Sequence, residues 1–177
     1  LHGDKDKAKW MVDNIVTNSW NDQTDLGKPI KECIFELKLA YPKYAPYIVA
    51  YWYCYKDMDG GEIPGIYDVM KDLKERGYQL YCLTNWSHET FPIVKKVHAR
   101  LFELFDGIVV SGEEKMVKPN PEIYNLLLGR YNLNASESVF IDDRQRNVDG
   151  ANQVGIQGIL FTGSNNLKEQ LAQLSIL

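Results

Sequence analysis

Four short apolar runs, each followed by a segment with helical periodicity, limit the folds open to this chain. The runs lie at residues 78–83, 107–110, 139–141 and 158–161. Apolar runs of this length, bounded by polar and turn-forming residues, are typical of strands buried on both faces of a parallel sheet. Strands that alternate with helices form right-handed βαβ units. The chain is therefore predicted to adopt an α/β fold with a mostly parallel sheet.

Helices are expected between these strands. One runs from Ser87 to about Lys96, and another begins at Pro121, because the missing N–H of proline is tolerated in the first turn of a helix. The last helix is expected to present one apolar stripe, made of Leu167, Leu171 and Leu174.

Residues 1–62 have a different pattern and are predicted to form a small helical subdomain. They contain no strand-like run, and their apolar residues recur with helical spacing. One expected face consists of Ile30, Cys33, Ile34 and Leu37, and a second consists of Tyr44, Ile48, Tyr51 and Tyr55. The segment Asp59-Gly60-Gly61 is the expected hinge into residues 63–177, because paired glycines leave the backbone free to turn.

The composition excludes several classes of function. A chain of 177 residues with 45% hydrophobic side chains has room for one sizeable core. Its 20 basic and 24 acidic residues give a net charge of -4, without a basic stripe for nucleic acid or an anionic membrane. The three cysteines form no Cys-x-x-Cys pair, and no apolar stretch approaches the roughly 20 residues of a membrane span. We expect a cytoplasmic protein without nucleic acid or membrane partners.

Polar residues follow three of the predicted strands at the point where each strand ends. Thr84 and Asn85 follow the first strand, Lys118 follows the second, and Asp142 and Asp143 follow the third. Because the carboxyl ends of parallel strands lie along one edge, we expect these side chains to converge on one small ligand. A hydroxyl and a lysine suit a phosphate, and two adjacent carboxylates, which repel each other, suit Mg²⁺. Asp143 is the expected direct metal ligand, and Asp142 is expected to bind through water or to support the site.

These strand ends resemble the motifs of the haloacid dehalogenase superfamily of hydrolases. The second, third and fourth motifs of that superfamily are matched, in order, by Thr84-Asn85, by Lys118 with Pro119 and Pro121, and by Asp142-Asp143. The surrounding residues are similar to the subgroup that carries a small helical cap. This subgroup includes sugar-phosphate phosphatases, 2-haloacid dehalogenases and the N-terminal domains of some epoxide hydrolases. The resemblance implies a Rossmann-like parallel sheet with flanking helices in residues 63–177 and a helical cap in residues 1–62.

The first motif of the superfamily, an apolar strand that ends in Asp-x-Asp or a single Asp, is absent from this sequence. Asp4-Lys5-Asp6 has the letters, but no strand precedes it. In the superfamily the first Asp attacks phosphorus to form an aspartyl-phosphate, and the second protonates the leaving oxygen. The superfamily's sheet places this strand between the runs at 78–83 and 139–141, which would otherwise lack a shared hydrogen-bonding partner. We therefore expect the nucleophile upstream of residue 1, and the 177-residue chain alone to be inactive.

The resemblance also suggests roles for individual side chains. Thr84, Asn85 and Lys118 are expected to bind the phosphate and to absorb charge on the transferring group. Asn147, in the first turns of the helix after the aspartate pair, is expected to brace the metal site. Candidates for substrate contact, in a predicted loop of the helical subdomain, are Trp20, Asn21 and Gln23. The aromatic residues Tyr47, Tyr51, Trp52, Tyr53 and Tyr55 are expected to be mostly core, with a roof over the substrate as the alternative.

Three functions are compatible with these observations. The first is a Mg²⁺-dependent phosphatase that acts on a small phosphorylated metabolite. The second is a metal-independent 2-haloacid dehalogenase, which has no need of the two acids Asp142 and Asp143. The third is a non-catalytic phosphate-binding module, which is the literal interpretation of a chain without a nucleophile. A homodimer is also possible, because the tyrosine-rich cap can supply an interface.

Overall fold

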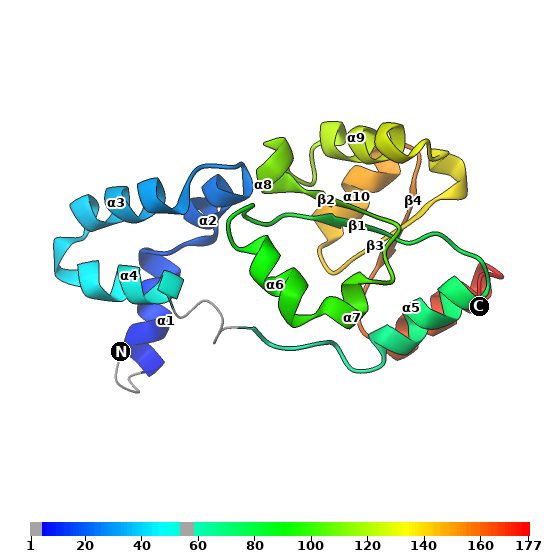
Figure 1. Cartoon of the computed structure of the whole chain (residues 1–177), viewed down its shortest axis with the longest axis horizontal. Helices are drawn as coiled ribbons and strands as arrows, with labels where there is room; N and C mark the ends of the chain where they lie inside the picture. The colour runs from blue at the N-terminus through cyan, green and yellow to red at the C-terminus, as the bar shows by residue number, and fades with distance from the viewer. Residues whose placement is uncertain (1–4, 54–58) are drawn as a thin grey trace.

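The structure is a computed structural model and describes residues 5–53 and 59–177 (Figure 1). Its N-terminal part, the helical segment, consists of α1 (Lys5–Asn14), α2 (Asn18–Asp25), α3 (Ile30–Ala40), a 3₁₀ turn (Pro42–Tyr44) and α4 (Ala45–Tyr53). The remainder, the α/β segment, consists of α5 (Ile66–Glu75), β1 (Tyr81–Thr84), α6 (Phe91–Val97), α7 (Ala99–Phe102), β2 (Gly107–Val110), α8 (Ser111–Glu114), α9 (Pro121–Tyr131), a 3₁₀ turn (Ala135–Glu137), β3 (Val139–Asp142), α10 (Gln145–Gln153), β4 (Gln157–Leu160) and α11 (Ser164–Gln173).

The helical segment has an apolar core of its own. Its buried members are Met11, Ile15, Val16, Trp20, Cys33, Leu37 and Ile48. α2 starts at Thr17, whose side-chain hydroxyl caps the helix by accepting a hydrogen bond from the backbone N–H of Trp20. The prediction of a loop around Trp20 was therefore wrong, because the cap and the burial of one face against α3 and α4 together favour a helix.

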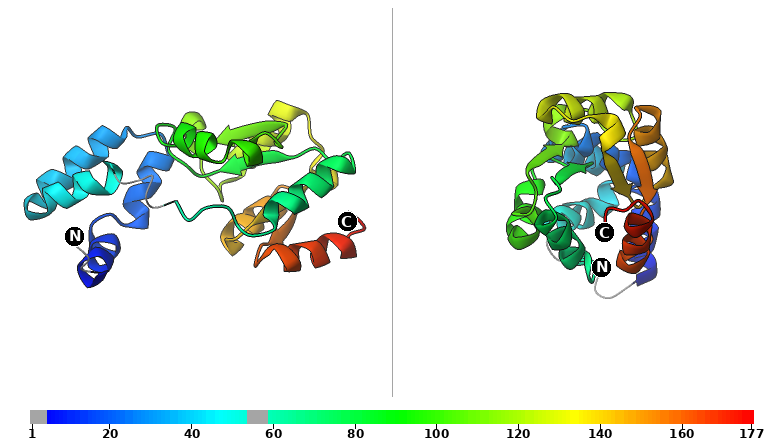
Figure 2. Two further views of the ribbon diagram at one scale, coloured as in Figure 1. Left: turned by 60° about the horizontal axis from the view of Figure 1, so that its bottom comes forward. Right: turned by 90° about the vertical axis from the view of Figure 1, so that its right-hand side faces the viewer.

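The strands of the α/β segment are parallel, which confirms the predicted α/β fold. β1 pairs with β2, with Leu83 opposite Val109, and β3 pairs with β4, with Ile141 opposite Ile159. Helices cover the strands on both sides (Figure 2). α9 and α10 contribute Ile123, Tyr124, Leu127 and Ala151 to a cluster around β1, β2 and β3, and α5 and α11 cover β4 with Val69, Leu73, Leu167 and Leu171.

The two strand pairs are separate sheets. Among the described residues β1 does not pair with β3, so each of these strands has a pairing partner on one side only. Ile141, in the middle of β3, is 37% exposed, although an apolar residue at the centre of a parallel sheet is normally buried. This is the arrangement expected where a further strand belongs between β1 and β3. Lys5 and Asp6 lie in the first turn of α1, and Asp4 lies outside the described residues.

Side chains occupy the outer edges of the two sheets. The Tyr131 hydroxyl accepts a hydrogen bond from the Ile108 N–H (3.0 Å) and donates one to the Ile108 carbonyl (3.2 Å). Gly107 is required there, because a Cβ at this position would lie 2.3 Å from the Tyr131 ring. At the other end the Gly158 N–H donates to Asn152 Oδ1 (2.8 Å). The outer edges are therefore partly satisfied within the chain.

Several element boundaries differ from the prediction. β1 begins at Tyr81 and not at Tyr78, because the residues before it are held by the Asp106 carboxylate, which accepts from the Leu80 N–H (2.8 Å) and from Lys74 Nζ (2.7 Å). α6 begins at Phe91, after a turn formed by residues 87–90. The apolar stripe of α11 contains Leu167 and Leu171 but not Leu174, which lies beyond the helix and is 36% exposed.

The predicted hinge, Asp59-Gly60-Gly61, is held against the helices that follow β1. Asp59 Oδ1 accepts from the Gly61 N–H (2.9 Å), and Asp59 Oδ2 lies 2.6 Å from His98 Nε2. Arg100 donates to both carboxylate oxygens of Glu62 (3.1 and 2.6 Å). Among the described residues, no helix has the length and apolar character needed to cross a lipid bilayer.

Candidate active site

The carboxyl ends of β1, β2 and β3 meet at one edge of the α/β segment, beneath a cavity of about 400 Å³. This volume lies in the lower part of the range usual for small-molecule sites, roughly 300–1,000 Å³. From the α/β segment the cavity is lined by Thr84, Asn85, Trp86, Ser87, Thr90, Lys118, Asp142, Asp143, Arg144 and Asn147. From the helical segment it is lined by Asn21, Asp22, Thr24, Asp25, Tyr51 and Trp52.

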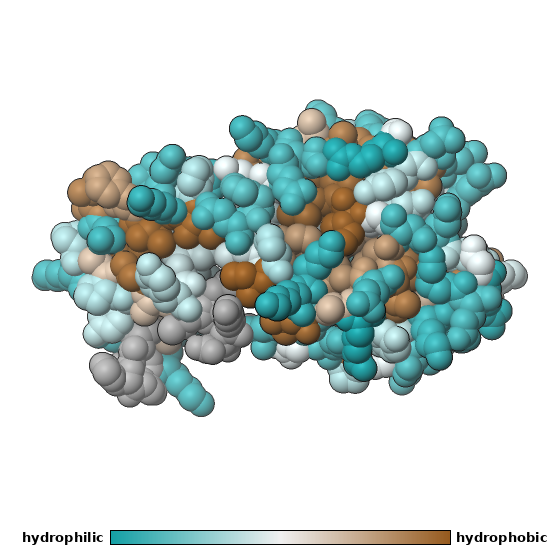
Figure 3. All heavy atoms as spheres, viewed as in Figure 1, coloured by the Kyte–Doolittle hydropathy of each residue, from teal (hydrophilic) through white to brown (hydrophobic). Residues whose placement is uncertain are grey.

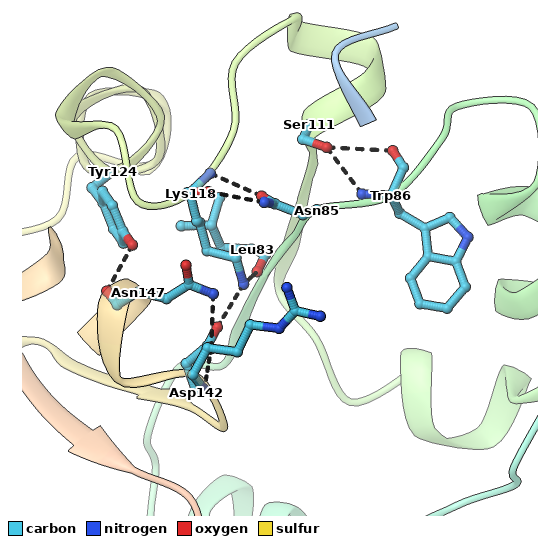
Figure 4. Close-up of polar contacts among 9 residues, drawn as sticks. Leu83, Asn85, Trp86, Ser111, Lys118, Tyr124, Asp142 and Asn147 are labelled. Atoms are coloured by element: carbon cyan, nitrogen blue, oxygen red, sulfur yellow. Dashed lines mark hydrogen bonds and ion pairs between the residues drawn. The ribbon is translucent and has the colours of Figure 1, made fainter. Parts of the chain in front are cut away.

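Lys118 links the two separate sheets at this edge (Figure 4). Its side chain is only 9% exposed. Its Nζ donates to the Leu83 carbonyl at the end of β1 (2.7 Å) and to Asp142 Oδ2 at the end of β3 (2.8 Å). A buried cation held in this way places positive charge at the floor of the cavity, where an anionic group can bind.

Asn85 holds the loop that carries Lys118. Its Nδ2 donates to the Lys118 carbonyl (3.0 Å), and the Lys118 N–H donates to Asn85 Oδ1 (2.9 Å). Both ends of the amide therefore contact the backbone of Lys118 (Figure 4). The structure thus gives Asn85 a positioning role, whereas the sequence had suggested direct phosphate binding.

Asp142 is surrounded by hydrogen-bond donors. Its Oδ1 accepts from the Arg144 N–H and from Asn147 Nδ2, both at 2.9 Å, and its Oδ2 accepts from Lys118. Burial alone would raise the pKa of Asp142, but the Lys118 ammonium and these hydrogen bonds hold that pKa below its ordinary value. Asp142 is therefore ionised at neutral pH, and both of its carboxylate oxygens accept hydrogen bonds from other residues of the protein.

Asp143 differs from its neighbour. Its side chain is exposed, lines the cavity, and forms no hydrogen bond or ion pair with the described residues. Asn147, which is 4% exposed, directs Nδ2 to Asp142 but has no partner for its buried Oδ1. A carboxylate and an amide oxygen without partners fit a hard cation such as Mg²⁺. The described residues contain no cluster of three or more His, Cys, Asp or Glu side chains that could hold a metal, so these groups can supply only part of a coordination shell.

The loop after β1 is fixed against the end of β2. The Trp86 N–H donates to Ser111 Oγ (2.9 Å), the Ser111 hydroxyl lies 3.4 Å from the Trp86 carbonyl, and the Gly112 N–H donates to that carbonyl (3.1 Å). Thr84 lines the cavity and its hydroxyl has no partner among the described residues. Trp86, Ser87 and Thr90 also line the cavity, although they were not predicted as site residues. Because these residues closely follow a buried strand, the sequence alone could have indicated that they lie near the site.

The structure corrects the predicted substrate contacts. Trp20 is 6% exposed, packs 5.5 Å from the Trp52 ring in the core of the helical segment, and does not line the cavity. Gln23 accepts a hydrogen bond from Lys28 (3.0 Å) and does not line it either. Residues 18–25 form a helix and not the predicted loop, and this helix directs Trp20 and Gln23 away from the cavity. The other face of α2 presents Asn21, Asp22, Thr24 and Asp25 to the cavity, and only Asn21 had been predicted.

The aromatic residues of α4 divide between two environments. Tyr51 and Trp52 line the cavity and also pack against the core of the helical segment. Tyr47 packs against the same core, whereas Tyr53 is 82% exposed. Tyr55 lies outside the described residues.

The helical segment contacts the α/β segment through the end of α2. Gly27 has φ of +86°, and a Cβ at this position would lie 2.7 Å from the Gly112 carbonyl oxygen in α8. The Ile30 N–H at the start of α3 donates to Glu89 Oε1 (2.8 Å) in the loop after β1. These contacts place α2 over the strand ends (Figure 1).

Comparison with known proteins agrees with this arrangement of strand-end residues. The sequence pattern of haloacid dehalogenase-like hydrolases matches residues 9–155. The chain belongs to the haloacid dehalogenase-like hydrolase family. It is 35% identical over 106 residues to a sesquiterpene phosphatase of Aspergillus oryzae, in an alignment that covers 60% of this chain and 54% of that protein. It is 30% identical over 116 residues to a ribulose-1,5-bisphosphate 5-phosphatase of Halopiger xanaduensis, in an alignment that covers 65% of this chain and 48% of that protein. The chain thus spans about half the length of these curated relatives.

Solved structures share the fold of this chain. A protein described as a predicted HAD-like family hydrolase, from Porphyromonas gingivalis, has a TM-score of 0.72 at 20% identity and covers 93% of this chain and 83% of its own. A HAD family enzyme of Bacteroides thetaiotaomicron, solved as a magnesium complex, has a TM-score of 0.69 at 22% identity and covers 93% and 86%. At this level of identity the likeness shows the fold.

Proposed function

We propose that this hydrolase is a Mg²⁺-dependent phosphatase of small phosphomonoesters that acts through an aspartyl-phosphate. The observation that carries the proposal is the pair of charged groups at the floor of the cavity. There the buried Lys118 ammonium, which suits a phosphate, lies beside the carboxylate of Asp143, which has no partner among the described residues and suits a metal ion. Relatives named as phosphatases support the class of reaction.

Each side chain at the floor of the cavity has a role in this proposal. The Lys118 ammonium neutralises charge on the phosphoryl group, and the Thr84 hydroxyl donates a hydrogen bond to it. Asn85 and Asp142 keep Lys118 in place through the contacts described above. Asp143 and the Asn147 amide oxygen would hold Mg²⁺. When bound, the metal stabilises negative charge on the phosphoryl oxygens.

The reacting carboxylate is proposed to come from a strand that occupies the space between β1 and β3. The unpaired inner edges of these strands and the exposure of Ile141 support this location. The carboxylate forms a bond to phosphorus as the ester P–O bond breaks, and the leaving oxygen takes up a proton. Water then cleaves the aspartyl-phosphate and releases inorganic phosphate. The 177-residue chain alone is expected to lack this activity.

The helical segment is proposed to be a cap that covers the site, with residues 1–62 as its extent and residues 63–177 as the hydrolase core. This division is supported by the separate apolar core of α1 to α4 and by the face of α2 that lines the cavity. A cap in this position excludes bulk water and contacts the part of the substrate that leaves. The cytoplasmic location and the homodimer expected from the sequence stay predictions.

The proposal is tested by hydrolysis of p-nitrophenyl phosphate and a panel of phosphorylated metabolites. The protein is produced from its complete reading frame and assayed with added Mg²⁺ and after exhaustive chelation. We expect turnover that disappears on chelation and returns with Mg²⁺, and no turnover by the 177-residue chain alone. Turnover of phosphate esters that survives chelation would contradict the proposal. Release of halide from a 2-haloacid without metal would indicate a dehalogenase instead.

A further inference from the structure

The face of α2 above the cavity carries polar groups without partners. The side chains of Asn21, Asp22 and Asp25 line the cavity, and none forms a hydrogen bond with another described residue. Asp25 is the most constrained of the three, because it is only 8% exposed. The carboxylate of a residue this buried, without a donor among the described residues, is unfavourable unless a ligand supplies one.

The electrostatic surroundings of Asp25 support the same conclusion. Burial and, to a smaller extent, the neighbouring charge of Asp22 raise the pKa of Asp25 to about 6, and the charge of Arg144 opposes this rise. Other charged side chains that line the cavity are Lys118, Asp142 and Asp143. The fold thus holds two acids of one helix together over the cavity, where the charge of Asp22 disfavours the ionised form of Asp25.

The lining selects among the groups that could satisfy these acids. An ammonium would donate to these acids, but Arg144 and Lys118, which line the same cavity, would repel it, and it has no acceptor for the Asn21 amide. A purely apolar group would leave Asn21 and Asp25 without partners. A hydroxyl group donates to a carboxylate and also accepts from an amide such as that of Asn21. Beside these groups Tyr51 and Trp52 supply aromatic surface, against which the carbon skeleton of a polyol can pack.

We propose that Asp25, with Asp22 and Asn21, selects substrates whose leaving group is a small polyol, that is, a compound with several hydroxyl groups near the phosphate. The proposal rests on the function proposed above and specifies its substrate class. In this proposal the side chains of α2 determine which leaving group is accepted, and the residues at the strand ends bind the phosphate. The hydroxyls donate to the carboxylates of α2 while the phosphoryl group contacts Lys118.

The proposal is tested by binding rather than turnover, with non-hydrolysable phosphonates and the protein from its complete reading frame in the presence of Mg²⁺. Isothermal titration calorimetry compares 3,4-dihydroxybutylphosphonate with butylphosphonate, with 3-aminopropylphosphonate and with inorganic phosphate. We expect the dihydroxy compound to bind about tenfold tighter than the butyl compound. The variant Asp25→Leu should remove most of this preference while inorganic phosphate still binds as before.

Two further variants serve as controls. Asp25→Asn keeps the shape of the side chain and should retain part of the preference, so a fold defect in the leucine variant can be recognised. Glu32→Leu, at an exposed position of α3 that does not line the cavity, should leave all affinities unchanged.

The outcomes separate the two proposals. If phosphate binds but the butyl or aminopropyl compound binds as tightly as the dihydroxy compound, the polyol specificity is wrong and the phosphatase proposal stands. A preference for the dihydroxy compound that persists in Asp25→Leu would show that α2 does not select it. If neither phosphate nor any phosphonate binds, both proposals are wrong.

Discussion

Lys118 and Asp25 are both charged residues buried at the cavity, but their surroundings differ. Lys118 has two acceptors within 2.8 Å, and one of them is the ionised Asp142. Asp25 has no donor among the described residues and lies close enough to Asp22 for their charges to interact. Burial of a charge is tolerated where partners offset the loss of hydration and is unfavourable where they do not. Substitutions at the two positions are therefore expected to change stability in opposite directions.

The substitution Lys118→Met is expected to destabilise the protein and to abolish activity. It leaves the buried Asp142 carboxylate without its cation, and we expect the free energy of unfolding at pH 7 to fall by about 3 kcal/mol. Because the pKa of Asp142 is lowered in the folded state, the stabilisation from this pair is present above the ordinary pKa of 3.8 and is lost as the pH falls through the lowered value. Urea denaturation at pH 7 and near pH 3 measures the difference, which should shrink at the lower pH.

The matched control for this prediction is Lys95→Met, at an exposed position of α6. Its stability and activity should stay close to those of the unmodified protein. For Lys118→Met, the rate of phosphate ester hydrolysis should fall by at least about a hundredfold, as expected for removal of a charge-stabilising donor. A variant with unchanged turnover would show that Lys118 does not act on the phosphoryl group.

The substitution Asp25→Asn is expected to stabilise the ligand-free protein above pH 6. The folded-state pKa of about 6 lies above the ordinary 3.8, so ionisation is disfavoured in the folded state and stability falls as the pH rises between these values. The asparagine variant does not lose stability in this way. Its free energy of unfolding at pH 7.5 should therefore exceed that of the unmodified protein by roughly 2–3 kcal/mol. Thermal unfolding at pH 4 and pH 7.5, with Glu32→Gln as the control, measures it. An equal gain at both pH values would argue against an ionisation effect.

At the scale of elements, the contact between α2 and α8 decides which side chains reach the substrate. α2 is a short helix with a polar face, and its position over the strand ends depends on the close approach of Gly27 to Gly112. Part of the surface of the helical segment is apolar (Figure 3). Phe35 and Leu39 of α3 are among its exposed apolar residues. A helix of eight residues is stabilised mainly by tertiary packing, so its placement follows from these contacts and not from local propensity.

The substitution Gly27→Ala tests the importance of this contact. The new Cβ would lie 2.7 Å from the Gly112 carbonyl, so α2 must shift away from α8. We expect a several-fold rise in KM for the preferred substrate with a smaller change in kcat. Gly77→Ala is the matched control, because Gly77 has nearly the same φ (+89° against +86°) but no atom within 4 Å of the added Cβ. Both variants should lose about 1 kcal/mol of stability, and only Gly27→Ala should change KM.

At the scale of the whole molecule, the α/β segment consists of two strand pairs joined at one edge by a buried lysine. Parallel strands are normally buried between neighbours on both sides, but within residues 5–53 and 59–177 β1 and β3 each pair on one side only. Lys118 connects their carboxyl ends, and the helices packed around β1, β2 and β3 hold the pairs together. This organisation predicts that the stability of β1 and β3 depends on a strand between them.

Hydrogen exchange tests this prediction. Peptides that contain β1 and β3 should exchange faster in the 177-residue chain than in the protein from the complete reading frame, because a central strand would protect their inner edges. Peptides from the outer strands β2 and β4 serve as the internal control and should differ less. Equal protection of β1 and β3 in the two proteins would show that no strand enters between them.

Much of the fold and the floor of the site could be predicted from the sequence alone. The alternation of short apolar runs with helical segments predicts the parallel strands, because both periodicities are local properties of the chain. Thr84, Lys118, Asp142 and Asp143 could be predicted to lie together because each is at or beyond the carboxyl end of a strand, and all four line the cavity. The bracing contact of Asn147 with Asp142 also agrees with its predicted place in the helix after the aspartates.

What the sequence determined by itself is the α/β class of this chain and the residues at its strand ends. Only the tertiary structure decided that α2 turns Asp22 and Asp25 to the cavity and buries Trp20, because the rotation of a short helix depends on what it packs against. It also decided that Asn85 holds Lys118 and that β1 and β3 stay apart. These features depend on contacts between residues far apart in the chain, which local patterns do not encode.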